Sequence, residues 1–213
     1  RATLALAEHL HSTCRPLFDE TLALADKSHA QSVLQPGRVV FQPMIVHGLP
    51  AARALGVIGP DKNNRNDVLC FNLSSDPAAY LRATTSELRL LLGGAPSPIV
   101  TLRTNAQPMV FPADGSETGA RLHSLVLEQN GDIDMSLDEL AGRAARVADQ
   151  ELLVRITTAL ADIRAALEVP VEIDARLYAG GYPSEVDIVN HQNVVRRAFP
   201  HDRPELASQL GDP

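Results

Sequence analysis

The chain has 213 residues, of which 45% are hydrophobic and 21% charged, and these globular values argue against wholesale disorder. Its 19 Lys and Arg residues and 26 Asp and Glu residues give a net charge of −7, which argues against a general electrostatic grip on nucleic acid but leaves a local basic face possible. No run of about 18 apolar residues is present, so the sequence predicts no membrane span. Aromatic residues make up 4% and Trp is absent, which predicts an aliphatic core.

The opening segment predicts a helix that is already running at residue 2. Leu4, Leu6 and Leu10 have helical spacing, and no capping residue followed by an acid three positions later precedes them. We therefore expect a fragment of a longer protein, cut inside or at the start of a helix. The alternative is a processed or trimmed chain with a frayed end. Pro16 indicates a turn, after which a second short helix is expected over 17–28.

Short segments rich in β-branched residues follow the Pro-Gly turn at 36–37. We expect strands at 38–41, 44–46, 54–58, 67–73, 98–103 and 108–111. Pro43 separates the first two of these segments, which we interpret as one strand with an edge or a bulge at the proline. The last two strands are expected to pair with each other around Asn105, and the polar residues 61–66 are expected to form an exposed turn.

Helical spacing dominates the rest of the chain. A helix over 77–92 should bury four leucines, which are Leu81, Leu88, Leu91 and Leu92. Three more are expected at 120–129, 136–148 and 151–167, the second with a capping box of Ser136 and Glu139. A late strand at 171–173, a Gly-Gly turn at 180–181 and a final helix at 185–199 complete the prediction. Strands followed by helices indicate an α+β fold.

No catalytic motif is complete in this sequence. Phosphate-binding loops and nucleophile elbows are absent. His9 and His11 are two positions apart on a helix and cannot face one ion together. The two cysteines have no CxxC spacing, which suits the reducing cytoplasm, and Cys70 lies in an apolar strand as a buried structural thiol would.

The carboxylates of two-metal nuclease chemistry are also missing. Proofreading-type exonucleases combine an Asp-x-Glu strand with a His five positions before an Asp, so that two cations can be held together. Only Asp149-Gln-Glu151 has the first spacing, and it lies between two expected helices. None of the seven histidines is followed by Asp five positions later. We assign no catalytic and no metal-binding residue to this chain.

Three stretches, in order along the chain, resemble bacterial exodeoxyribonuclease I. The first has the triplet Asn64-Arg65-Asn66, a strand that ends at Leu73 and a Leu-rich helix over 86–92. The second spans 96–110, where the family has a strand pair around an Asn-x-x-Pro-Val element. The third is the Asp-Ala-Arg-Leu-Tyr-Ala-Gly-Gly run at 174–181. Near the start, Ala-Thr-Leu-Ala at 2–5 and Leu-Phe-Asp at 17–19 are similar to segments that follow the family's last catalytic His and Asp.

The resemblance implies a fold and a domain organisation. Residues 1–34 would be the terminal helical segment of an exonuclease domain of ribonuclease H-like fold, with a linker. Residues 35–195 would form an SH3-like β-barrel or sheet domain elaborated with helices. Residues 196–213 would lead toward a C-terminal helical domain. On this interpretation the chain begins just beyond the nuclease motifs.

The function implied is a part in 3′→5′ degradation of single-stranded DNA. The SH3-like domain would help to enclose the strand and to dock the C-terminal tail of single-stranded DNA-binding protein. Mg²⁺ would be held in the nuclease domain, so this chain alone is expected to be inactive. A monomeric cytoplasmic protein without membrane contact is the matching expectation.

Side chains that can contact phosphates or stack on bases are the candidates for DNA binding. They are Arg38, Arg53, Asn64, Arg65, Arg103 and Tyr178. For Asn64 and Arg65 the alternative is a solvated turn in which Asn bonds its own backbone. For Tyr178 the alternative is a core position with a hydrogen-bonded hydroxyl. The family's partner-binding aromatics include a Trp, which this chain lacks.

Two other functions fit the same sequence. One is a stand-alone module that captures an acidic peptide and does not bind DNA. The other is a structural domain that only orients its neighbours.

Overall fold

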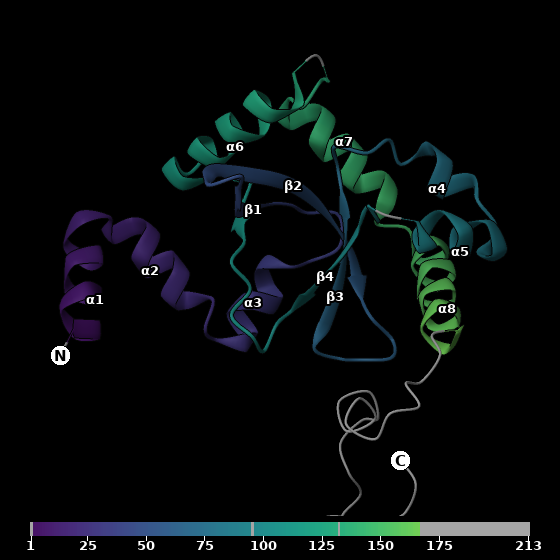
Figure 1. Cartoon of the computed structure of the whole chain (residues 1–213), viewed down its shortest axis with the longest axis horizontal. Coiled ribbons are helices and arrows are strands. Elements are labelled where there is room, and N and C mark those ends of the chain that lie inside the picture. Colours follow the sequence, from purple (N-terminus) through teal and green to yellow (C-terminus); the bar gives the residue numbers. More distant parts are fainter. Residues whose placement is uncertain (1, 95, 132, 167–213) are drawn as a thin grey trace, which may run out of the picture. The chain divides into compact units, whose positions relative to one another are not determined.

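The computed structural model describes residues 2–94, 96–131 and 133–166 (Figure 1). Chain contacts define one compact unit over Arg1–Arg164. It is built of helices and one antiparallel sheet, as the α+β prediction required. The strand, turn and helix expected at 171–173, 180–181 and 185–199 lie outside the described residues, as does Tyr178. No helix in the described ranges has the length and apolarity needed to span a bilayer.

Five strands form the sheet in the order β4-β3-β2-β1-β5. They are β1 (Val39–Val46), β2 (Leu49–Pro60), β3 (Asp67–Asn72), β4 (Ile99–Arg103) and β5 (Phe111–Pro112). The expected pairing of 98–103 with 108–111 is wrong, because β4 pairs with β3 and β5 pairs with β1. The two segments therefore lie at opposite edges of the sheet. Both are short and apolar, and nothing in such a pattern specifies the partner strand.

A tight hairpin joins β1 to β2. Its turn residues His47 and Gly48 have φ of 51° and 81°, the left-handed values of a two-residue type I′ turn. Because this turn keeps the strands in register, β2 begins at Leu49 and is longer than the expected strand at 54–58. Pro43 lies where β1 has no neighbour beyond β2, since β5 pairs only with Val40 and Phe41. The expected edge at Pro43 is therefore confirmed.

The sheet buries apolar side chains on both faces, and successive residues of a strand go to opposite faces. Phe41, Ala54 and Phe71 belong to the large cluster, which also contains the buried side chains of the later helices. Leu55 and Cys70 belong to the small cluster, which includes Val33 and Leu34 at the end of α3. Figure 1 shows α6 and α7 over β2.

Three helices open the chain: α1 (Ala2–Thr13), α2 (Arg15–Ala23) and α3 (Lys27–Val33). The helix expected from residue 2 is confirmed. Pro16 lies in the first turn of α2, where its missing N–H removes no helical hydrogen bond. The single helix expected over 17–28 is wrong, because Asp26 caps α3 by accepting from the His29 amide at 2.8 Å.

Five helices follow: α4 (Ala78–Arg82), α5 (Thr85–Gly93), α6 (Glu117–Asn130), α7 (Leu137–Val147) and α8 (Gln150–Ala166). The single helix expected over 77–92 is divided into α4 and α5. Thr84 and Glu87 form a capping box that starts α5, and Ala83 has an extended backbone. Leu88 and Leu92 are buried as expected, whereas Leu91 is 40% exposed.

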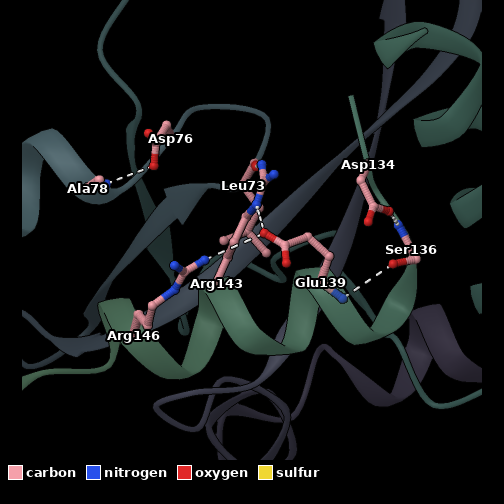
Figure 2. A network of polar contacts seen from close by, with 8 residues as sticks. All are labelled: Leu73, Asp76, Ala78, Asp134, Ser136, Glu139, Arg143 and Arg146. Atoms are coloured by element: carbon pink, nitrogen blue, oxygen red, sulfur yellow. Dashed lines mark hydrogen bonds and ion pairs between the residues drawn. The ribbon is translucent and has the colours of Figure 1, made fainter. Parts of the chain in front are cut away.

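A polar network fastens α7 to the end of β3 (Figure 2). Arg143 donates from Nε to Glu139 Oε1 at 2.7 Å and from Nη1 to the Leu73 carbonyl at 2.8 Å. Ser136 Oγ accepts from the Glu139 amide, but the Ser136 amide donates to Asp134 Oδ1. The expected capping box is thus only half formed, because Arg143 competes for the Glu139 carboxylate.

Candidate nucleic-acid interface

The loop between β2 and β3 is held in shape by its own short polar side chains. Asp61 Oδ1 accepts from the Asn63 amide at 2.9 Å, and Asn64 Oδ1 accepts from the Asn66 amide at 3.1 Å. The Asp67 amide donates to the Asn64 carbonyl at 2.9 Å. These are side-chain turns of the kind Asp and Asn favour, so the Asn64 side chain stabilises its own backbone. The loop backbone is ordered before any ligand binds.

Two distant segments are fastened to this loop through Asn66. Lys27 at the start of α3 donates from Nζ to Asn66 Oδ1 at 2.7 Å. Thr104, directly after β4, donates its amide and its hydroxyl to the Asn66 carbonyl at 2.8 and 3.1 Å. Thr104 and Lys27, which are 38 and 39 residues from Asn66 in sequence, therefore both contact Asn66.

Five cations surround the loop, and all except the half-buried Lys27 are exposed. Arg103 Nε lies 3.8 Å from Asp67 Oδ1, and the Arg103 side chain is 70% exposed whereas that of Asp67 is 10% exposed. Arg164 Nη1 lies 3.8 Å from Asp61 Oδ2 in the same arrangement. Each buried carboxylate thus orients a guanidinium that still faces solvent. We call this surface the cationic end, and its cations are Lys27, Lys62, Arg65, Arg103 and Arg164.

The cationic end differs in charge from the chain as a whole. Its five cations are accompanied by three carboxylates, those of Asp26, Asp61 and Asp67, so its net charge is about +2. The full chain carries −7. The chain has only two lysines, and both lie here.

The structure brings together three of the sequence-predicted residues, and Tyr178 lies outside the described residues. Asn64, Arg65 and Arg103 all lie at the cationic end. Arg53 alternates with the large-cluster residue Ala54, so its side chain is on the small-cluster face, away from Arg103. Arg38 is exposed just before β1.

Arg53 has an unusual environment for a cation. Its Nε donates to Gln42 Oε1 at 2.8 Å, and no carboxylate among the described residues lies within 4.0 Å of its guanidinium. Burial lowers the pKa of Arg53 from its ordinary value, and the charge of an ionised Cys70 would act in the opposite direction. Burial in turn raises the pKa of Cys70 to about 12, as expected for a structural thiol.

Sequence reasoning missed Lys27, Lys62 and Arg164. Lys62 was recoverable, because it lies in the same polar run as Arg65. Lys27 and Arg164 carry no local signal, since only the packing of α3 and α8 brings them to the loop.

The acids with nuclease-like spacing do not form a metal site. Asp149 Oδ1 accepts from the Leu152 amide at 2.7 Å and so caps α8. Glu151 is 83% exposed and lies 3.9 Å from Arg155. Within the described ranges, no group of three His, Cys, Asp or Glu residues could hold a metal ion. These residues do not fit the Mg²⁺ chemistry of a nuclease.

The fold is an α+β arrangement that solved exonuclease structures share. No family model and no curated protein matches the sequence. Similar structures come from Escherichia coli exonuclease I. Its metal-free complex with single-stranded DNA matches at 19% identity and a TM-score of 0.64, over 99% of this chain and 46% of that one. An exonuclease I complex with SSB-Ct matches at 19% identity and a TM-score of 0.63, over 99% of this chain and 44% of that one.

A third exonuclease I structure, described as suggesting how processivity is achieved, matches at 18% identity and a TM-score of 0.66, over 99% of this chain and 44% of that one. The chain therefore has an exonuclease I-like fold and spans less than half the length of these structures.

Proposed function

We propose that this chain is the SH3-like, non-catalytic part of an exonuclease I-like enzyme that degrades single-stranded DNA from the 3′ end. The observation that carries the proposal is the cationic end, a locally positive surface on an otherwise acidic chain with an exonuclease I-like fold. In this proposal the surface contacts the DNA backbone and helps to enclose the strand. The carboxylates and Mg²⁺ that cleave DNA belong to the nuclease domain.

The exposure of these cations and the weakness of their existing contacts support binding to phosphates. Asp67 is buried and holds Arg103 at 3.8 Å, beyond the length of a good charge-assisted hydrogen bond. The exposed guanidinium can therefore reach a phosphate without first losing a strong partner. Arg65 and Lys62 lie on the ordered loop, so little backbone entropy is lost when they bind. The loop amides supply polar contacts but no sequence readout.

DNA binding is tested with a fluorescein-labelled oligo-dT by fluorescence anisotropy over a salt series. Replacing Lys62 and Arg65 by Ala should weaken binding and should lower the salt slope by about 0.7 per lost phosphate contact. The matched control replaces Arg89 and Arg121, exposed residues of α5 and α6, because it changes the net charge equally. If both double variants lost the same affinity for oligo-dT, binding would depend only on the net charge of the chain. The cationic end would then not be the DNA-binding surface.

Docking of the acidic tail of single-stranded DNA-binding protein is the second part of the proposal. It is supported by the resemblance to exonuclease I, for which a complex with that tail is known. Arg53 is the best placed cation for a carboxylate, because Gln42 orients its guanidinium and no carboxylate of the described residues neutralises it. An acidic C-terminal peptide should bind, and Arg53→Lys should weaken it several-fold because bidentate geometry is lost.

Binding of oligo-dT and binding of the acidic peptide together distinguish the exonuclease I-like role from a stand-alone peptide-binding module. A stand-alone peptide-binding module would bind the acidic peptide but not oligo-dT at any salt concentration. Salt-dependent binding of oligo-dT favours the exonuclease I-like role. We further expect a monomer that shows no Mg²⁺-dependent nuclease activity. Robust digestion that Asp149→Ala abolished would contradict the non-catalytic assignment.

A further inference from the structure

The segment that connects α6 to α7 borders an open groove away from the cationic end. The groove has a volume of about 610 Å³ and is lined by residues of α6, the connection and the start of α7. Three of its apolar side chains are solvent exposed to a similar degree: Leu127 at 44%, Ile133 at 45% and Leu137 at 42%. These three apolar side chains are grouped in one place, unlike the isolated exposed leucines that are common on protein surfaces.

The floor of the groove is fixed by contacts to the core. Met135 is 1% exposed and belongs to the large cluster. Its carbonyl is 2.7 Å from His123 Nε2, and the His123 ring stacks on the buried Phe41 at a centroid distance of 5.6 Å. The amide of Ile133 donates to the Asn130 carbonyl at 3.1 Å. A groove whose walls are already fastened loses little entropy when a partner binds.

The charged residues that line the groove are acidic. Asp134 and Asp138 lie at its rim, and no Lys or Arg is among its lining residues. Arg121 of α6 pairs with Glu117 at 3.2 Å. Arg143 of α7 is bound to Glu139 and Leu73 and also acts electrostatically on Asp134, so Asp138 is the rim carboxylate without such an effect from Arg143. Hydrogen bonds from Ser136 hold the pKa of Asp134 below its usual value, so Asp134 is charged at neutral pH.

We propose that this groove docks a partner protein through a segment in which an apolar side chain is flanked by Lys or Arg. The apolar side chain would pack on Leu127, Ile133 and Leu137, and the flanking cations would face Asp134 and Asp138. Charge complementarity selects this occupant. An acidic peptide or a nucleic acid would be repelled at the same rim. The site is therefore separate from the DNA- and tail-binding surfaces proposed above and does not depend on them.

The test uses three fluorescein-labelled heptapeptides and fluorescence anisotropy at low and at physiological salt. The first has the sequence Lys-Arg-Leu-Ile-Leu-Arg-Lys. The second replaces every Lys and Arg by Glu, and the third replaces the three central apolar residues by Ser. The first should bind with a dissociation constant below about 1 mM, and the other two should bind at least about tenfold more weakly. Equal binding of the Glu peptide, or no binding of the first peptide, would overturn the proposal.

Two groove variants then locate the binding, each with a matched control. Ile133→Ser should weaken the first peptide by about tenfold, because it removes an apolar contact. Its control is Leu90→Gln, an apolar residue of α5 that is 75% exposed outside the groove and should leave binding unchanged. Asp138→Asn should weaken binding about threefold at low salt and less at high salt. Its control is Asp162→Asn, an exposed acid of α8.

Folding of every variant is checked by thermal unfolding before binding is compared. If the groove variants and their controls weaken binding equally, the peptide is attracted by the overall negative charge and the groove is not the site. If Asp138→Asn weakens peptide binding but Ile133→Ser has no effect, the apolar side chains of the peptide do not pack in the groove and the proposal fails.

Discussion

Gly56 of β2 lies directly beneath Ala144 of α7, so closely that a Cβ on Gly56 would be 3.1 Å from the Ala144 Cα and 2.9 Å from Leu73 Cδ2. Two small residues thus set how near α7 approaches the sheet. The backbone of a helix cannot move aside as a flexible side chain can. This approach brings Arg143, one residue before Ala144, within reach of the Leu73 carbonyl.

Alanine substitutions at two glycines, one at the close approach and one away from it, are expected to change the free energy of unfolding in opposite directions. Gly56→Ala should lower the free energy of unfolding by about 1–3 kcal/mol, because the added methyl group overpacks the interface. Gly142→Ala, on the exposed side of α7 with no atom within 4 Å of the added Cβ, should raise it by about 0.5–1 kcal/mol through helix propensity. Urea unfolding measures both. A stabilising Gly56→Ala would mean that α7 can shift outward without cost.

Arg143 and Arg146 share one carboxylate but differ in burial, which gives a matched pair (Figure 2). The Arg143 side chain is 15% exposed and also satisfies the Leu73 carbonyl, so Arg143→Met should cost about 1–3 kcal/mol. The Arg146 side chain is 54% exposed and lies 3.5 Å from Glu139, so Arg146→Met should cost less than about 1 kcal/mol. Equal losses in urea unfolding would show that the Leu73 contact contributes nothing.

The buried thiol predicts a stability that depends on pH in the alkaline range. Burial raises the pKa of Cys70 from an ordinary 9.0 to about 12, so the folded state holds its proton where the unfolded chain has lost it. This contribution is fully present below pH 9 and is lost as the pH rises toward 12. Chemical unfolding between pH 8 and about 11 should show the loss in the native protein but not in Cys70→Ala.

Thiol modification checks the same burial independently. At neutral pH a thiol reagent should modify Cys14, which is partly exposed, and should leave Cys70 unmodified until the chain unfolds. Two equally fast thiols in the native protein would contradict the buried position.

The hairpin turn predicts a further pair of effects. His47→Asn should raise the free energy of unfolding by up to about 1 kcal/mol, because Asn adopts positive φ more readily than His and Asn-Gly is the favoured type I′ pair. Gly48→Ala should lower it by about 1–2 kcal/mol, since φ there is 81° and a Cβ disfavours that conformation. Thermal unfolding of both variants measures these changes in stability. A neutral Gly48→Ala would mean that the turn can change type.

Much of the local structure could be predicted from short-range patterns in the sequence. The strand expected at 67–73 contains the apolar run 68–71, and the last three helices show apolar residues at helical spacing. The polar loop at 61–66 was also predictable, because Asp and Asn form turns with their own side chains. Even the division at Thr84 carried a signal, the Thr-x-x-Glu capping box, although overall helical spacing masked it.

The sequence by itself determined which segments are apolar, where the turns fall and which cations are available. Tertiary structure alone decided that β4 and β5 lie at opposite edges, because short strands do not encode their partners. It also decided that Arg53 and Arg103 occupy opposite faces, since that depends on register, and that Lys27 and Arg164 reach the β2–β3 loop. Local propensity acts over a few residues, whereas the cationic end is assembled from segments that only the packed core brings together.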